Sequence, residues 1–205
     1  MEIHIMKKLI TWLDALLKKY KFFIFVFLFL SYSNITYASE RWILDKSLST
    51  VEFELPVLFA KNVKGRFNTI EGFVELDVDQ KKNNKAIFYV EVNDIDMNYI
   101  KYKDLLLSNV FFDVQQFPKA VVDTNKFSYV NETELTLDVE LTIKGKSKIV
   151  PLSINLKRLA EELVQIKSEL TFSRTAFEIG IGNWENTSIL KDKVKLTTNL
   201  FLFRE

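Results

Sequence analysis

Apolar and polar residues alternate with a period of two through most of the chain beyond residue 50. In the clearest run, residues 135–143, every odd position is Leu, Val or Ile and every even position is Thr, Asp or Glu. This alternation places the apolar side chains on one face of a β-strand. Comparable runs at residues 51–55, 74–78, 88–92, 150–156, 164–172 and 194–202 predict seven or eight strands in all. A tight turn is expected at Lys144-Gly145-Lys146.

Strands with one apolar face must cover that face, either by stacking into a sandwich or by closing into a barrel. Closure also removes the exposed edges of the sheet. We therefore predict an all-β fold: a single closed antiparallel β-barrel of about eight strands. The interior of such a barrel is filled by side chains or holds one small or slender ligand.

Residues 96–118 interrupt the alternation. Tyr99, Tyr102 and Leu106 are spaced as on one face of a helix, which predicts a short helix here. The run Leu105-Leu106-Leu107 and the pair Phe111-Phe112 are too apolar for an ordinary solvated loop. Two interpretations stay open: the segment plugs one end of the barrel, or it is a mobile lid over a ligand entrance.

The first 38 residues are typical of a signal peptide. Lysines precede the apolar run Phe22 to Leu30, and Thr36 and Ala38 supply the small residues of a cleavage site after Ala38. We expect residues 39–205 to form one exported, periplasmic domain. Without the leader, Lys plus Arg fall from 28 to 23 and Asp plus Glu from 27 to 25, a net charge of −2. This balance gives no reason to expect nucleic-acid binding.

No cysteine or histidine occurs after residue 38. The domain therefore has no Cys or His metal ligands and no Ser-His or Cys-His nucleophile pair. We expect no catalytic residues, no metal and no cofactor. A hydrolase that uses carboxylates alone, drawing on Glu71, Asp77 or Asp104, is an alternative. A second alternative is a ligand-free interaction module with a solid core, which the alternation by itself favours.

Arg174 shares its parity with Leu170 and Phe172, so it is expected to point into the barrel. A buried arginine must be paired or must reach a polar group of a ligand. One interpretation is a salt bridge to Asp45, Asp104 or Asp113, and the other is a hydrogen-bonding anchor for a ligand head group. Ser168 also points inward and is interpreted as a small spacer.

Several motifs follow one another at characteristic spacing. They are Trp42-Ile43-Leu44-Asp45, Val63-Lys64-Gly65-Arg66-Phe67, Leu106-x-Ser108-x-x-Phe111-Phe112-Asp113-Val114, Leu141-Thr142-Ile143-Lys144-Gly145 and Ser173-Arg174-Thr175-Ala176-Phe177-Glu178-Ile179-Gly180. Together they resemble the YceI-like family over the whole of residues 39–205. The resemblance implies an exported protein with a lipocalin-like barrel that binds polyisoprenoids. Many members carry two histidines where this chain has Val57 and Leu105, so any head-group contact made by those histidines is missing.

The resemblance favours a hollow barrel over a solid one. It implies a binding protein that carries or stores a long-chain isoprenoid or related lipid, such as a quinone. Its partners would be that lipid, transiently a membrane, and a second copy of the chain in a homodimer. The residues expected to contact the lipid are Phe53, Leu55, Phe67, Val74, Leu76, Phe88, Val90, Leu106, Phe111, Phe112, Leu137, Val139, Leu141, Ile154, Leu170, Phe172 and Arg174.

Overall fold

The computed structural model describes residues 6–7, 12, 39–77, 82–128 and 133–205. The predicted signal peptide, residues 1–38, falls almost entirely outside these ranges, and so does its cleavage site. Residues Ala38–Glu205 form a compact unit of their own, which we call the barrel unit. Within the described ranges, no helix is both long enough and apolar enough to cross a bilayer.

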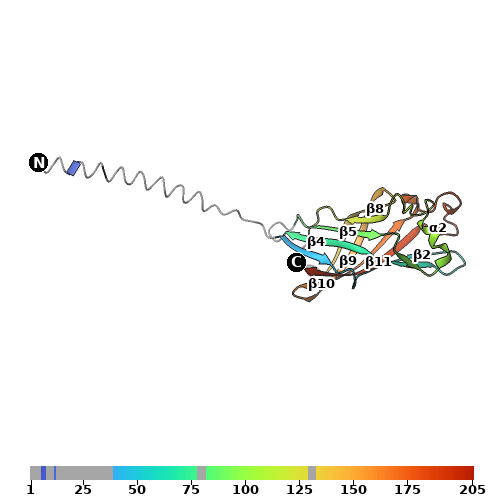
Figure 1. Cartoon of the computed structure of the whole chain (residues 1–205), viewed down its shortest axis with the longest axis horizontal. Coiled ribbons are helices and arrows are strands. Elements are labelled where there is room, and N and C mark those ends of the chain that lie inside the picture. The colour runs from blue at the N-terminus through green and yellow to red at the C-terminus, as the bar shows by residue number, and fades with distance from the viewer. Residues whose placement is uncertain (1–5, 8–11, 13–38, 78–81, 129–132) are drawn as a thin grey trace. The chain divides into compact units, whose positions relative to one another are not determined.

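The barrel unit is built almost entirely of strands (Figure 1). The strands are β1 (Ser39–Leu44), β2 (Thr50–Leu55), β3 (Val63–Phe67), β4 (Ile70–Asp77), β5 (Lys85–Glu91), β6 (Ile95–Met97), β7 (Lys119–Asp123), β8 (Glu134–Ile143), β9 (Lys146–Ala160), β10 (Leu163–Ser173) and β11 (Lys193–Arg204). The helices are α2 (Lys103–Leu107) and the single 3-10 turns η1 (Ile100–Tyr102), η2 (Thr175–Phe177) and η3 (Gly182–Trp184).

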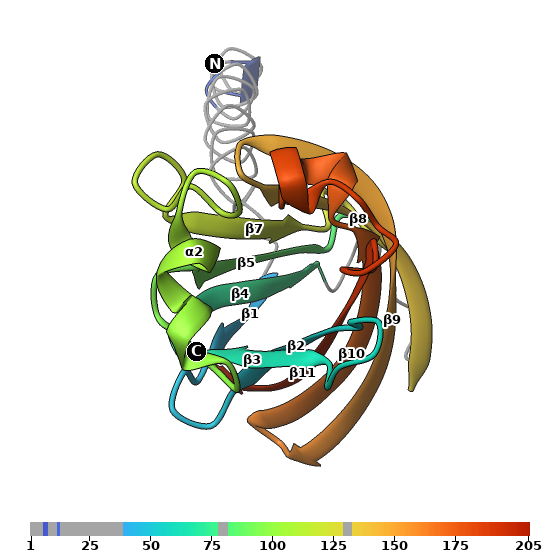
Figure 2. The same ribbon diagram turned by 90° about the vertical axis from the view of Figure 1, so that its right-hand side faces the viewer.

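Eight of the strands close into an antiparallel ring in the order β1-β4-β5-β7-β8-β9-β10-β11. The ring closes where β1 pairs with β11, with Trp42 opposite Arg204 and Leu44 opposite Leu202. Figure 2 shows β4, β5 and β7 on one side of the ring, and β9 and β10 curving around the other. The predicted closed antiparallel barrel of about eight strands is confirmed.

The remaining strands form a branch on the barrel wall. The first half of β11 pairs with β2 rather than β1, and β3 and then β6 continue outward from β2. Ring strands β1 and β7 and branch strands β3 and β6 are short and were not among the predicted strands. A strand of three to six residues gives few alternations, and β2, equally short, was predicted because residues 51–55 alternate strictly.

The hairpin between β8 and β9 turns at the predicted place. Lys144 and Gly145 both have positive φ, 51° and 68°, as a two-residue type I′ turn requires. Ile143 pairs directly with Lys146 across the turn. The Lys144 ammonium also donates hydrogen bonds to the carbonyl oxygens of Asn109 and Glu178, at 2.7 and 3.0 Å. The hairpin is thereby tied to two loop segments at one end of the barrel.

These two loop segments cover that end of the barrel, which we call the capped end. One is residues 98–118, which contain the predicted short helix as η1 and α2. The other is residues 174–192, between β10 and β11. The two segments contact each other through two backbone hydrogen bonds. The N–H groups of Gly180 and Ile181 both donate to the Val110 carbonyl, at 2.9 and 3.1 Å. In Figure 2 this end faces the viewer.

Candidate functional site

The barrel encloses a cavity of about 370 Å3. Its wall consists of inward-facing side chains from the ring strands, from β2 and β3, and from the two capping segments. The side chains therefore do not meet in the middle, and the solid core that alternation alone favoured is wrong. A bore of this kind, narrow and apolar, suits a thin hydrocarbon chain better than a large polar substrate.

The predicted contact residues converge on this cavity. Those that line it are Phe53, Leu55, Phe67, Val74, Leu76, Phe88, Val90, Leu106, Phe111, Phe112, Leu137, Leu141, Ile154, Leu170, Phe172 and Arg174. Val139 is the exception: it is fully buried, with 0% of its surface exposed, but it does not reach the cavity. Its inward parity was correct, but a position within the core does not guarantee a place on the cavity surface.

Sequence reasoning missed part of the wall. Trp42 on β1, Val122 on β7 and Phe127 after β7 all line the cavity. So do Ile179, which belongs to the motif around Arg174, and Val194, near the start of β11. Trp42, Ile43 and Leu44 are all apolar, so this motif shows no alternation in the sequence that could have assigned Trp42 to the inner face. Phe127 and Ile179 lie outside the strands, where alternation gives no prediction.

The capped end is filled by aromatic packing. The Phe111 ring meets the Trp184 ring edge-on with centroids 5.7 Å apart, and Phe172 and Phe177 meet similarly at 5.4 Å. Phe112 packs against Phe67 from the wall at 6.4 Å. Edge-to-face pairs add to the stability gained from burial. These contacts hold residues 98–118 against the cavity in this structure, and both predictions for residues 96–118, a plug and a mobile lid, stay predictions.

Arg174 lies at the capped end and is completely buried, with 0% exposure. Its guanidinium donates to four backbone carbonyls of the loop that returns to β11. The acceptors are Lys191 O at 3.0 Å, Leu190 O at 2.9 Å, Ile179 O at 2.8 Å and Gly180 O at 3.3 Å. Among the described residues no carboxylate pairs with it, so the predicted salt bridge to Asp45, Asp104 or Asp113 is wrong.

These contacts define what Arg174 does chemically. A guanidinium has five N–H donors, and four are used on carbonyls, so one remains for a ligand. Burial lowers the pKa of Arg174, and the charge of nearby Asp192 partly opposes that shift. Because even a lowered arginine pKa leaves the group charged at neutral pH, Arg174 acts as a cationic clamp on the loop.

Asp192 fixes the other side of the same loop. Its carboxylate oxygen Oδ1 accepts hydrogen bonds from the hydroxyls of Ser173 and Thr175, at 2.9 and 2.7 Å, and from the Thr175 amide at 3.2 Å. Burial raises the pKa of Asp192, but these hydrogen bonds outweigh it, so the net pKa lies below the usual 3.8. The last residue of β10 is thereby tied to the residue just before β11.

The cavity wall has few polar groups. Ser168 and Thr198 face each other across β10 and β11, and their hydroxyls hydrogen-bond to each other at 2.6 Å. Trp42 lines the cavity near the opposite end, and its indole N–H is buried with no partner among the described residues. Arg158 also lines this end. The indole N–H is therefore available to an oxygen of a bound molecule.

Carboxylates do not converge on the cavity. Along its described wall the one acidic residue is Glu40. Glu71 and Asp104 are exposed, and neither they nor Asp77 line the cavity. The described residues also contain no cluster of acidic or histidine side chains that could hold a metal ion. A carboxylate-only hydrolase needs two acidic side chains near each other, and the described residues of the cavity wall do not supply such a pair.

The chain matches the family model of the YceI-like domain over residues 42–202. This chain belongs to the YceI-like family. The match spans the whole ring, from β1 to β11, and so covers every side chain that forms the cavity wall except Glu40. No curated protein sequence matches the chain.

Solved structures share the fold of this YceI-like chain. BcnA of Burkholderia cenocepacia has a TM-score of 0.70 at 23% identity, over 77% of this chain and 98% of its own. A polyisoprenoid-binding domain of Saccharophagus degradans, implicated in plant cell wall breakdown, has a TM-score of 0.62 at 16% identity, over 80% and 98%. The Campylobacter jejuni YCEI protein has a TM-score of 0.60 at 19% identity, over 73% and 89%. At these identities the likeness shows the fold.

Proposed function

We propose that this protein binds a long-chain isoprenoid or a related lipid, with the hydrocarbon chain inside the barrel. The observation that carries the proposal is the cavity of about 370 Å3 with its almost wholly apolar wall. Burial of ligand surface there would be worth about 25 cal/mol per Å2. The similarity to the Saccharophagus degradans polyisoprenoid-binding domain supports the same ligand class.

A polar head group, such as a quinone ring, would meet its donor at the Trp42 end of the cavity. There the indole N–H lacks a partner, whereas Arg174 at the capped end has used four of its five donors. The Trp42→Phe variant keeps an aromatic ring but removes this donor. We expect it to retain long-chain hydrocarbons but to lose preference for ligands that carry a carbonyl group. Unchanged preference would contradict this placement.

We further propose that the protein acts as a carrier or store and not as an enzyme, and that it works after export. The leader pattern of residues 1–38 supports export, and the single carboxylate on the described cavity wall supports binding without catalysis. Mass spectrometry of the protein from its host should give a chain that begins at Ser39. Turnover of chromogenic glycosides would contradict the non-enzymatic role. A homodimer stays a prediction.

Organic extraction of the purified protein followed by mass spectrometry tests the lipid proposal. We expect a reproducible hydrophobic compound from the parent protein. Ala86 is buried, small and on the cavity wall, so Ala86→Phe should reduce the recovered compound several-fold by filling the bore. The matched control is Ile87→Phe, on the same strand but outside the cavity lining. A cavity that is always empty, or equal loss in both variants, would refute the proposal.

A further inference from the structure

The connection between β2 and β3 carries an exposed aromatic side chain. Phe59 is 98% exposed, and Leu58 beside it is also exposed. The backbone of Phe59 is left-handed, with φ of 59°, a conformation that bulky residues rarely adopt. Strain of this kind persists only where surrounding contacts impose it, and it is concentrated at functional positions. Those contacts come from both sides of the loop.

On one side the β2–β3 connection contacts the loop that precedes β11. The Leu58 amide donates to the Ile189 carbonyl at 2.9 Å, and Val57 forms an isolated β-bridge with Leu190. The side chain of Ile189 is itself exposed. Three exposed apolar side chains, those of Leu58, Phe59 and Ile189, are therefore brought together from two loops.

On the other side the connection contacts the start of the capping segment. The Tyr99 hydroxyl donates to the Lys61 carbonyl at 3.1 Å. Ile100 and Tyr102, which follow in η1, are both exposed. We call the exposed residues gathered by these contacts the apolar tip. Its members are Leu58, Phe59, Ile100, Tyr102 and Ile189.

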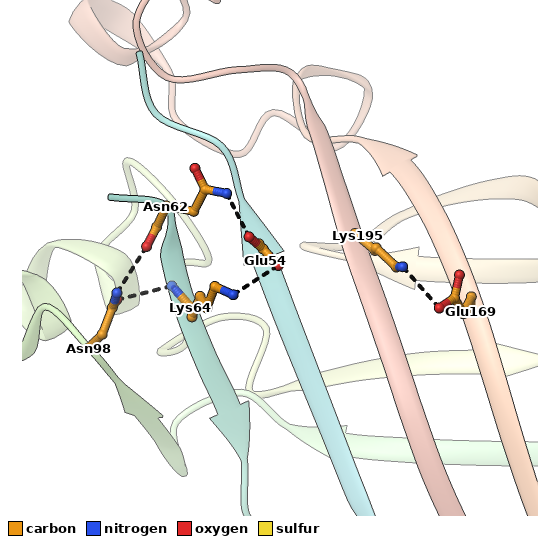
Figure 3. Close-up of polar contacts among 6 residues, drawn as sticks. All are labelled: Glu54, Asn62, Lys64, Asn98, Glu169 and Lys195. Atoms are coloured by element: carbon orange, nitrogen blue, oxygen red, sulfur yellow. Dashed lines mark hydrogen bonds and ion pairs between the residues drawn. The ribbon is translucent and has the colours of Figure 1, made fainter. Parts of the chain in front are cut away.

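The base of the tip is held by a polar network on the outer surface of β2 and β3 (Figure 3). The Glu54 carboxylate accepts a hydrogen bond from the side-chain amide of Asn62 at 2.6 Å. It also forms an ion pair with the Lys64 ammonium at 3.2 Å. The side-chain amide of Asn98 donates a hydrogen bond to the backbone carbonyl of Asn62 at 2.9 Å and accepts one from the backbone N–H of Lys64 at 3.0 Å. A preorganised tip loses little conformational entropy when it docks.

The segments that form the tip carry charged side chains of one sign, although acidic residues adjoin them at Glu54, Asp104 and Glu185. The segments that form it, residues 56–63, 98–103 and 186–191, contain four lysines and neither aspartate nor glutamate. The lysines are Lys61, Lys101, Lys103 and Lys191. The barrel domain as a whole is negative, with 23 basic and 25 acidic residues, so this cluster departs from the rest of the surface. The Lys101 ammonium also lies 5.0 Å from the centre of the Tyr102 ring.

We propose that the apolar tip docks on the surface of a bilayer that contains anionic phospholipid. Exposed Phe, Leu, Ile and Tyr side chains surrounded by lysines are the combination that the interface of such a bilayer favours. The tip is continuous with α2, whose Leu106 lines the cavity, so docking would bring the capped end to the membrane. The idea that docking serves lipid exchange rests on the proposed function. The docking proposal itself does not depend on that function.

Vesicle flotation tests the proposal with residues 38–205, which are a compact unit with a closed ring of strands. The apolar run Phe22 to Leu30 is left out because it would bind vesicles by itself. We expect this protein to float with vesicles of phosphatidylcholine and phosphatidylglycerol at low salt, and much less with phosphatidylcholine alone. Added salt should weaken the binding, since the lysine contribution is screened.

Two variants of the tip are compared with two controls. Leu58→Ser with Phe59→Ser should weaken vesicle binding at least tenfold, and Lys61→Glu with Lys101→Glu should weaken it at least fivefold on the anionic vesicles only. The controls are Ile149→Ser and Lys157→Glu, exposed positions on β9, which should bind as the parent does.

Each outcome decides one claim. A parent protein that binds neither vesicle, or tip variants that bind like the controls, would overturn the docking proposal and leave a protein partner as the occupant of the tip. Organic extraction of the same variants distinguishes membrane docking by the tip from lipid binding in the cavity. Tip variants that keep their lipid but lose vesicle binding show docking apart from lipid binding. Tip-dependent docking by a protein without lipid refutes the proposed function alone.

Discussion

Replacing Arg174 by methionine is the sharpest test of how the capped end is held. Methionine keeps a long flexible side chain in the same space but removes every N–H donor. In the parent protein the buried guanidinium holds carbonyls from two parts of the loop before β11, at Ile179 and Gly180 and at Leu190 and Lys191. The variant therefore removes the group that joins the beginning of this loop to its end.

The expected loss follows from these contacts. Ile179, Gly180 and Leu190 are buried, so their carbonyls cannot turn freely to water. Each buried carbonyl that loses its partner costs about 1–3 kcal/mol. Removing a buried charge recovers part of that loss, because charge burial itself costs several kcal/mol. We expect a net decrease of about 3 kcal/mol in the free energy of unfolding at Tm, which lowers Tm by about 6–12 °C.

Thermal and urea unfolding measure this decrease, and Arg158→Met is the matched control. Arg158 also lines the cavity but is exposed, and it donates to the carbonyls of Ala160 and Glu161 near a hairpin. Its replacement should change stability by about 0.5 kcal/mol or less. Equal unfolding midpoints for the two variants would refute the clamp argument. A stable Arg174→Met protein that loses its lipid would instead make Arg174 a ligand anchor.

Three further results are expected. Gly145→Ala should destabilise the β8–β9 turn by about 1–2 kcal/mol in urea unfolding, because φ is +68° and the added Cβ would lie 2.6 Å from the Phe117 ring; an unchanged midpoint would contradict this. Because the pKa of Asp192 is lowered in the folded protein, the stability that its carboxylate contributes is complete above the ordinary value of 3.8 and is lost as the pH falls through the folded-state pKa. In Asp192→Asn the free energy of unfolding should therefore depend less on pH in this range. Hydrogen exchange should show the Gly180 amide, bonded to Val110, as slow as the β10 amides if the capping segment is a plug; fast exchange there favours the lid.

The sequence was sufficient where side-chain periodicity decides the structure. Long strands such as β8, β10 and β11 present many alternations, so their inward faces were predicted correctly almost residue by residue. The hollow interior could not be predicted from this alternation. Whether the side chains fill a barrel depends on its circumference and shear, which arise from all the strand registers together. Alternation indicates which way each side chain points but not the radius of the barrel, so it favoured a solid core.

Arg174 shows a second limit. Its inward parity was correct, but its partners were predicted as carboxylates because a buried charge usually has a counter-charge. The chain instead leaves the strand at Ser173 and enters η2, which places the guanidinium beside carbonyls from residues up to 17 positions away. Backbone carbonyls carry no residue-specific signal, so no sequence pattern could have identified them.

The two ends of the cavity differ in a way that bears on the ligand. At the capped end, Val57 and Leu105, where the family resemblance led us to expect histidines, both pack partly buried against the apolar core. Arg174 nearby has one donor left for a ligand. At the other end the Trp42 N–H has no partner among the described residues. A buried unpaired donor is costly, and a ligand oxygen would relieve that cost. We therefore expect a polar head group to bind at the Trp42 end, as proposed above.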